Sequence, residues 1–161
     1  MHVSARSQYR VREARRGDLP HLRRIERAAT PSAWPTRVLL QYLMRPDTVA
    51  RVVVSRSDDE VPVGFFIAML EEGDLYLANL AVAPAWRRRG VASFALGELD
   101  GLAKRLGYSS LLLDVKEENL GAQLLYRKHG FRAFEVKRRH YGEQDAYRMR
   151  KELAEVQRSR R

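Results

Sequence analysis

The sequence predicts an α/β fold on a single twisted sheet of mixed, mostly antiparallel strands. Three observations predict it. Strand-like runs joined by short turns fill much of the first half, the apolar period becomes helical after Pro84, and the apolar run 109–115 lies between two helical segments. We expect about seven strands flanked by about four helices, in one domain over 1–152 with a polar, basic, frayed tail over 153–161.

The amino-terminal part predicts one strand and two helices. Residues 8–14 alternate between apolar and polar types as a strand does. Asp18 is expected to cap a helix that has Pro20 in its first turn, and the loop TPSAWP separates this helix from a second one over 36–44. The apolar residues of the first helix share one face: Leu19, Leu22, Ile25 and Ala29.

Three strands follow these helices. Their short connections, over 57–60 and 71–73, predict hairpins and therefore antiparallel pairing. The expected strands are Thr48–Ser55, Val61–Leu70 and Asp74–Val82.

The second half predicts alternating helices and strands. Apolar residues at helical spacing indicate a helix that begins near Val91 and stops at Gly107. The run 109–115 is nearly continuous in apolar residues, as expected for a central strand with both faces covered. A helix over 119–129 and strands over 131–141 and 145–151 complete the expected order.

The amino-acid composition excludes several kinds of functional site. The chain has 161 residues and no cysteine, which excludes disulfides, thiolate chemistry and cysteine zinc sites. Its 4 histidines have no ligand spacing, so no metal site is expected. No apolar run approaches the length of a membrane span, and the first ten residues lack the apolar core of a secretory signal. We expect a cytoplasmic protein with no membrane association.

The net charge of +10 is unevenly distributed. Residues 1–30 carry 8 basic and 3 acidic side chains and residues 127–161 carry 12 and 5, whereas residues 31–126 carry 10 and 12. The basic ends favour an acidic partner such as RNA, a ribosome surface or a polyanionic cofactor. Simple solubility explains the same charge, and without interleaved aromatic residues direct nucleic-acid binding is not favoured.

The stretch WRRRGVA, residues 86–92, places three arginines at the start of a helix, where the macrodipole opposes positive charge. The conflict disappears if an anion binds there. The N–H groups of the first helical turn, close approach at Gly90 and the guanidinium groups would together form a phosphate cradle. A solvated basic turn before an ordinary amphipathic helix is the alternative.

This stretch resembles the signature of a known family. The run 87–92 is similar to the R/Q-x-x-G-x-G/A pattern of the GCN5-related N-acetyltransferases (GNAT), and the likeness extends from LANLAVAPAW before it to ENLGAQLLYRKHGF after it. Within that family the chain most resembles the bacterial ribosomal-protein-alanine N-acetyltransferases. The resemblance implies a splayed central strand pair and acetyl-CoA as the acetyl donor.

By the same resemblance, the pyrophosphate of acetyl-CoA would bind the arginine–glycine loop, and backbone groups of the preceding strand would hold the pantetheine arm. The apolar side chains of residues 80–82 are equally explained by burial in an ordinary strand. The implied cofactor-binding residues are Leu80, Ala81, Val82, Arg87, Arg88, Arg89, Gly90, Val91, Ala92, Ser93, Asn119 and Tyr126.

Acetyl transfer from a thioester to an amine requires a polarised carbonyl, a neutral amine and a proton donor for the departing thiolate. Asn119 and Tyr126 are two helical turns apart and share one helix face, where Asn119 is also a suitable N-cap. The resemblance, through N-x-x-A-x-x-L-Y, implies that Tyr126 is the proton donor. A half-buried core tyrosine is the alternative.

Asp114 is the candidate general base. It interrupts an apolar strand, where a carboxylate needs water or a partner. The resembled subfamily has a glutamate base here, which implies the same role for Asp114, with a bridging water to extend its shorter side chain. Glu117 or Glu118, just past the strand, are alternatives.

Three residues are candidates for the acceptor side. Asn79 is polar in an otherwise apolar strand, and it either orients the amine or is a satisfied buried amide. Trp34 lies where family members close over the acceptor, and Tyr141 could form the opposite wall. Both could equally be core or surface aromatics.

The sequence therefore predicts an acetyl-CoA-dependent N-acetyltransferase for a protein N-terminal α-amine, ribosomal by resemblance. Alternatives keep the cofactor and change the acceptor to a small amine, an amino acid, a polyamine or a lysine side chain, because loops outside a shared core select acceptors. From another class, a non-catalytic RNA-associated or acetyl-CoA-binding module would not require the Asn119–Tyr126 pair. The sequence does not indicate which oligomeric state the protein adopts.

Overall fold

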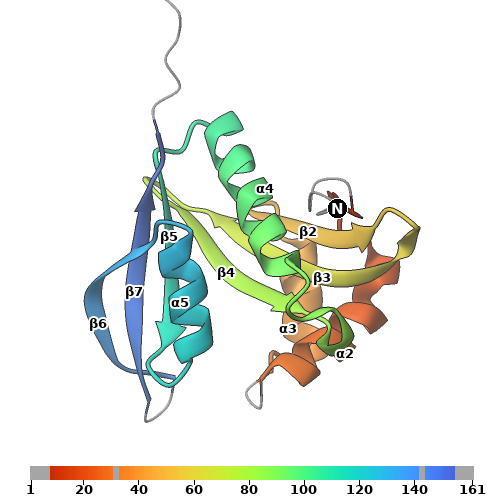
Figure 1. Cartoon of the computed structure of the whole chain (residues 1–161), viewed down its shortest axis with the longest axis horizontal. Helices are drawn as coiled ribbons and strands as arrows, with labels where there is room; N and C mark the ends of the chain where they lie inside the picture. The colour runs from red at the N-terminus through yellow and green to blue at the C-terminus, as the bar shows by residue number, and fades with distance from the viewer. Residues whose placement is uncertain (1–7, 31–32, 142–143, 155–161) are drawn as a thin grey trace, which may run out of the picture. The chain divides into compact units, whose positions relative to one another are not determined.

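The computed structural model describes residues 8–30, 33–141 and 144–154. Its strands form a 7-stranded sheet in the order β1-β2-β3-β4-β5-β7-β6 (Figure 1). The strands are β1 (Tyr9–Glu13), β2 (Thr48–Ser55), β3 (Asp58–Leu70), β4 (Leu75–Val82), β5 (Ser110–Lys116), β6 (Arg132–Tyr141) and β7 (Gln144–Glu152). The helices are α2 (Leu19–Ala29), α3 (Thr36–Met44), α4 (Val91–Arg105) and α5 (Leu120–Lys128), with short 3-10 turns η1 (Arg16–Asp18) and η2 (Pro84–Trp86).

The pairing confirms the mixed, mostly antiparallel sheet. β1 with β2, β2 with β3, β5 with β7 and β6 with β7 are antiparallel, whereas β4 with β5 is parallel. The parallel pair extends only over Leu75–Leu77 and Leu111–Leu113, as expected for a splayed central pair. Contacts divide the described chain into two compact units. The first unit runs up to Leu70 and includes Ala78–Glu98; the second comprises Glu71–Leu77 and the residues from Leu99 on.

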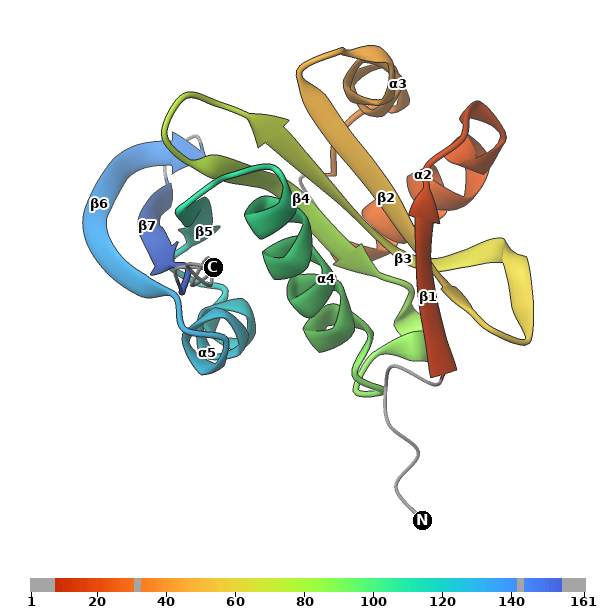
Figure 2. The same ribbon diagram turned by 90° about the horizontal axis from the view of Figure 1, so that it is seen from above.

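The first unit contains β1 to β3 with α2 and α3 (Figure 2). Its strands either alternate apolar and polar residues or contain continuous apolar runs. Their apolar side chains form one buried cluster between the sheet and the helices. Each fully buried aliphatic or aromatic side chain of this kind stabilises the fold by about 1.5–3 kcal/mol. The cluster consists of Leu22, Ile25, Leu39, Val52, Val54, Phe65, Ile67 and Ala81.

Helix α2 begins as predicted, after Asp18 and with Pro20 in its first turn, but two details of the prediction are wrong. Asp18 does not cap the helix with its side chain. Instead its carboxylate accepts two 2.8 Å hydrogen bonds from Arg12 and one of 2.7 Å from the backbone N–H of Arg15. Ala29 is exposed, and Glu26 is buried in the helix face that was expected to be apolar.

The second unit is centred on β5, in which Leu111, Leu112 and Leu113 are buried as expected for a covered strand. α5 lies over one face of the β5–β7–β6 group (Figures 1 and 2). Polar side chains of these strands form ion pairs: Arg148 of β7 pairs with Asp114 of β5, and Arg150 of β7 pairs with Asp74, which lies just before β4. This unit therefore combines an apolar face with a row of paired charges.

Candidate functional site

The predicted phosphate cradle is a turn of unusual backbone conformation. The turn occupies 87–90, between η2 and the start of α4 at Val91. Arg88 and Gly90 have positive φ angles of 61° and 79°, in the left-handed region that only glycine adopts without strain. Backbone concavities with left-handed residues bind anions, and the first turn of α4 adds N–H groups without intrahelical acceptors. The backbone therefore fits a bound phosphate.

The arginine side chains of this turn have separate contacts. Arg87 Nη2 donates a 2.9 Å hydrogen bond to the carbonyl of Ala28 at the end of α2. The Arg89 guanidinium carbon lies 5.1 Å from the centre of the Trp86 ring, and the Arg89 carbonyl accepts a 2.8 Å hydrogen bond from the Tyr9 hydroxyl. These contacts hold the turn to β1 and α2.

A pocket of about 630 Å³ lies beside this turn. Two arginines, two serines and two aromatic rings give it a cationic, partly apolar lining. Its lining residues are Gln8, Tyr9, Ser55, Arg56, Ser57, Trp86 and Arg89.

Gly64 in β3 sets how closely β4 and the start of α4 approach it. A Cβ built on Gly64 would lie 3.0 Å from the carbonyl oxygen of Ala81 and 3.0 Å from Cγ1 of Val91. Only glycine allows this approach without displacing either neighbour. Ala81 is buried, whereas Leu80 and Val82 are half-buried, so the strand proposed to hold pantetheine is anchored by its middle residue.

Two predicted acceptor residues meet at one carboxylate that the sequence analysis missed. Oε2 of Glu26 accepts a 2.8 Å hydrogen bond from Nδ2 of Asn79, and Oε1 accepts a 3.2 Å bond from the backbone N–H of Trp34. Glu26 is only 3 % exposed. The Trp34 ring stacks on Tyr42, with ring centres 4.6 Å apart. Asn79 and Trp34 thus lie on either side of a single buried side chain.

In the second unit, Asp114 has a fully buried side chain with both oxygens engaged. Arg148 donates from Nε to Oδ1 at 3.0 Å and from Nη2 to Oδ2 at 3.1 Å, and the Tyr76 hydroxyl donates to Oδ2 at 2.7 Å. The hydrogen bond to Asp114 raises the pKa of Arg148 above its usual value. Tyr76 is a second residue that the sequence analysis missed.

Helix α5 places Asn119 and Tyr126 as predicted. Oδ1 of Asn119 accepts a 3.1 Å hydrogen bond from the N–H of Ala122, which confirms its role as N-cap. Tyr126 is half-buried and its ring contacts Phe131 edge-on, with centres 5.8 Å apart. Glu117 and Glu118, the alternative bases, are exposed.

The remaining predictions concern Tyr141, a metal site and a membrane-spanning helix. Tyr141 is the last residue of β6 and pairs with Gln144 in the backbone register, but its side chain lies outside the described residues. Among the described residues, no group of three or more His, Asp or Glu could hold a metal ion. Within the same ranges, no helix is both long and apolar enough to span a membrane.

Glu26 and Tyr76 were missed by the sequence analysis for different reasons. Glu26 lies at helical spacing from Leu22, on the buried face of α2, and this position was the available signal. Tyr76 lies between the buried residues Leu75 and Leu77 in a strand of alternating burial, but nothing local links it to Asp114, 38 residues away. A contact between residues so far apart in the chain leaves no signal in the local sequence.

Comparison with known proteins adds four likenesses. A family model described as "Acetyltransferase (GNAT) family" matches residues 19–131. The chain is 28% identical to an N-alpha-acetyltransferase of Sulfurisphaera tokodaii over 88% of this chain and 92% of that protein. It is 29% identical to a [ribosomal protein bS18]-alanine N-acetyltransferase of Haemophilus ducreyi, over 81% and 88%. The crystal structure of the ribosomal-protein-S18-alanine N-acetyltransferase from Escherichia coli superposes with a TM-score of 0.82 at 22% identity, over 95% of this chain and 99% of that one.

Proposed function

The chain belongs to the Acetyltransferase (GNAT) family and is an acetyl-CoA-dependent N-acetyltransferase, and from this premise we propose that it acetylates the N-terminal α-amine of a protein. The observation that carries the proposal is similarity along more than four fifths of the chain to two enzymes named for this reaction, one archaeal and one bacterial. A ribosomal protein is the proposed acceptor, and the cytoplasm is the proposed location.

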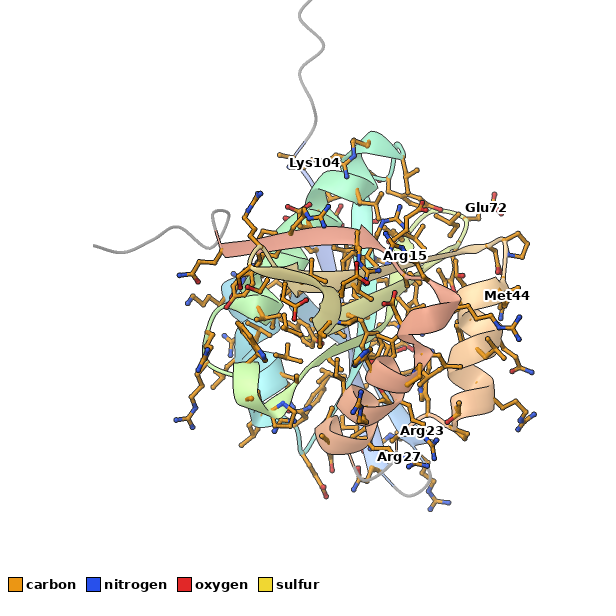
Figure 3. The ribbon with its side chains drawn as sticks, turned by 90° about the vertical axis from the view of Figure 1, so that its right-hand side faces the viewer. Arg15, Arg23, Arg27, Met44, Glu72 and Lys104 are labelled. Atoms are coloured by element: carbon orange, nitrogen blue, oxygen red, sulfur yellow. The ribbon has the colours of Figure 1, made fainter. Side chains whose placement is uncertain are left out.

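The surface of α2 supports an acceptor bound within an acidic assembly. Arg23 and Arg27 lie one helical turn apart on the exposed face of α2 (Figure 3). Cationic side chains of this kind attract polyanions such as ribosomal RNA over a distance of about 8 Å at physiological salt. Both side chains are exposed whereas Glu26 is buried, so they leave the buried side of the helix to the site.

We propose that residues 88–93 hold the pyrophosphate of acetyl-CoA and that backbone groups of Leu80, Ala81 and Val82 hold its pantetheine arm. When bound, acetyl-CoA supplies a thioester carbonyl and a thiolate leaving group. The positive φ angles of Arg88 and Gly90 and the close approach at Gly64 support this assignment. Asn119 is proposed to contribute its side-chain amide to the same cofactor.

Proton transfer is assigned to the second unit. Tyr126 Oη is proposed to donate a proton to the departing sulfur. Asp114 is proposed as the general base, acting through Tyr76: the tyrosine oxygen accepts a proton from the incoming amine while its own proton passes to Oδ2 of Asp114. The 2.7 Å hydrogen bond between these two side chains supports the relay, and Arg148 holds the carboxylate in place.

The test is acetyl-CoA turnover, followed by release of free thiol, with a panel of acceptors. We expect rapid turnover with a peptide that begins Ala-Arg and none with the same peptide blocked at its N-terminus, even when it contains an internal lysine. Turnover with spermidine or a free amino acid, and none with the open peptide, would reassign the acceptor to small amines. Binding of acetyl-CoA without turnover on any acceptor would favour a non-catalytic module.

A further inference from the structure

Glu26 is a buried carboxylate to which the proposed chemistry gives no role. It lies in α2, beside Leu22 and Ile25, and is 3 % exposed. Removing a carboxylate from water is costly unless hydrogen bonds or an opposite charge compensate. A glutamate in this place therefore needs a structural or functional reason.

Neutral donors provide the compensation. Oε1 accepts from the backbone N–H of Trp34 and Oε2 from the side-chain amide of Asn79. Among the residues that the structure describes, no lysine, arginine or histidine nitrogen lies within ion-pair distance, 4.0 Å, of Glu26. Each oxygen thus fixes one neighbour, and within the described ranges neutral donors alone hold the side chain.

The two neighbours come from separate segments that flank the site. Trp34 belongs to the segment between α2 and α3, and its ring packs against Tyr42 and the core cluster. Asn79 lies in β4, one residue before Leu80–Val82, which are proposed to hold pantetheine. A single side chain in α2 thereby sets the position of the Trp34 segment relative to that strand.

The end of α2 is held from a second direction. Arg87, the first residue of the cradle turn, donates to the carbonyl of Ala28, two residues after Glu26. The cation lies at the helix C-terminus, where the macrodipole favours it. α2 is thus tied to β4 through Asn79 and to the cradle through Arg87.

We propose that Glu26 is a positioning residue for the acceptor: it holds Asn79 and the Trp34 segment in the arrangement that receives the amine. The inference rests on the proposed function, because it assumes that these two residues face the acceptor. Glu26 does not touch the reacting atoms; it acts through Asn79 and Trp34. Its effect is therefore on acceptor binding and not on acetyl-CoA binding.

The kinetic test is Glu26→Gln, which replaces one accepting oxygen by an amide that cannot accept. Loss of a buried hydrogen bond of this type corresponds to about a tenfold change in an equilibrium constant. We expect acceptor KM to rise about tenfold while the Kd of acetyl-CoA changes less than about twofold. Glu60→Gln, at an exposed position in β3, is the matched control and should change neither value. An unchanged acceptor KM in Glu26→Gln overturns the proposal.

A spectroscopic test needs no acetyl transfer, so it separates failure of this inference from failure of the proposed function. The chain has 2 tryptophans, and Trp86→Phe leaves Trp34 as the single emitter. In that background, Glu26→Gln is expected to shift Trp34 emission to the red and to increase its quenching by acrylamide. Emission and quenching that stay the same overturn the positioning role even if the enzyme acetylates protein N-termini.

A double-mutant cycle tests whether Glu26 acts through Asn79. If it does, the acceptor KM of Glu26→Gln with Asn79→Ala should exceed that of the worse single variant by less than about twofold, because both remove the same contact. Effects that multiply would break the proposed link. Should Glu26→Gln fail to fold, Asn79→Ala alone serves: acceptor KM must still rise with acetyl-CoA Kd unchanged, and an unaltered KM overturns the proposal.

Discussion

The Tyr76 hydroxyl donates a 2.7 Å hydrogen bond to Oδ2 of Asp114, whose side chain is fully buried. Tyr76→Phe and Asp114→Asn each interrupt the proposed relay, so each should lower kcat/KM by about a hundredfold or more, because general base catalysis usually contributes about 10²–10⁴-fold. The double variant should be little worse than the more damaging single one, because both changes break one path. Initial rates of thiol release measure all three.

Tyr108→Phe is the matched control for these variants. Tyr108 also donates a hydrogen bond within the second unit, to the carbonyl of Glu71 at 2.9 Å, but it has no proposed role in transfer. Its rate should equal that of the wild type. If Asp114→Asn leaves the dependence of rate on pH unchanged, Asp114 is not the base, and Glu117 and Glu118 become the residues to replace.

Tyr126→Phe separates the proton donor from a packing role. The variant keeps the ring that contacts Phe131 and removes only the hydroxyl. We expect kcat to fall at least about tenfold, with acetyl-CoA Kd and the thermal midpoint almost unchanged. Steady-state kinetics and calorimetric titration supply these values. Full activity in Tyr126→Phe would leave only the core-tyrosine interpretation.

Local patterns predicted the elements well and the site only in part. α3 and β2 have the predicted bounds, because proline and turn residues mark where each begins or ends. The N-cap role of Asn119 is confirmed because a cap depends on the next three residues alone. Asp18 is the N-cap residue of α2 as predicted, but its side chain makes no capping hydrogen bond, because its carboxylate pairs with Arg12 in the preceding strand. Tyr76 was missed because its partner, Asp114, lies 38 residues away, whereas Glu26 had a local signal in its place on the buried face of α2.

Gly90→Ala tests whether the cradle depends on backbone conformation. Gly90 has a φ of 79° and no atom within 4 Å of a built Cβ, so the substitution adds backbone strain without a clash. Left-handed conformation costs an L-residue about 1–2 kcal/mol, which favours other conformations of the turn. Acetyl-CoA affinity should fall about fivefold to thirtyfold by titration.

Gly73→Ala is the control for this change. Gly73 has a similar φ of 91°, also with no atom within 4 Å, and it lies in the turn before β4. It should lower the free energy of unfolding by a similar amount and leave acetyl-CoA affinity intact. Equal affinities for Gly90→Ala and the wild type would show that the turn does not bind the cofactor through its backbone.

Gly64→Ala tests the close approach of β3 to β4, the strand proposed to hold the pantetheine arm. The new methyl group would lie 3.0 Å from the Ala81 carbonyl oxygen, which cannot rotate away as a side chain can. Overpacking of this kind costs about 1–3 kcal/mol, and displacing β4 should also weaken acetyl-CoA binding. Thermal unfolding and titration measure the two effects. Gly97→Ala, within α4 and without a neighbour in 4 Å, should instead raise stability by about 1 kcal/mol.

Asp18 should make stability depend on pH in the acid range. Burial raises the pKa of its carboxyl, but hydrogen bonds from Arg12 and from the Arg15 backbone outweigh burial, so that the pKa lies below the usual 3.8. A carboxyl with a lowered folded pKa stabilises the protein above its unfolded pKa, and this contribution is lost as the pH falls through the folded value. The free energy of unfolding should therefore decline below about pH 4.

Asp18→Asn should remove this part of the pH dependence. It leaves the buried Arg12 guanidinium without its ionised partner, since the two side chains are 8% and 6% exposed, so it should cost about 3 kcal/mol near neutral pH. Denaturant unfolding between pH 3 and 7 gives both quantities. Asp47→Asn is the comparison: its pKa is lowered by a hydrogen bond from Arg45, but the pair lies at the surface, where solvent screens it. An equal loss of stability in both variants would show that burial of the Arg12–Asp18 pair contributes nothing to its strength.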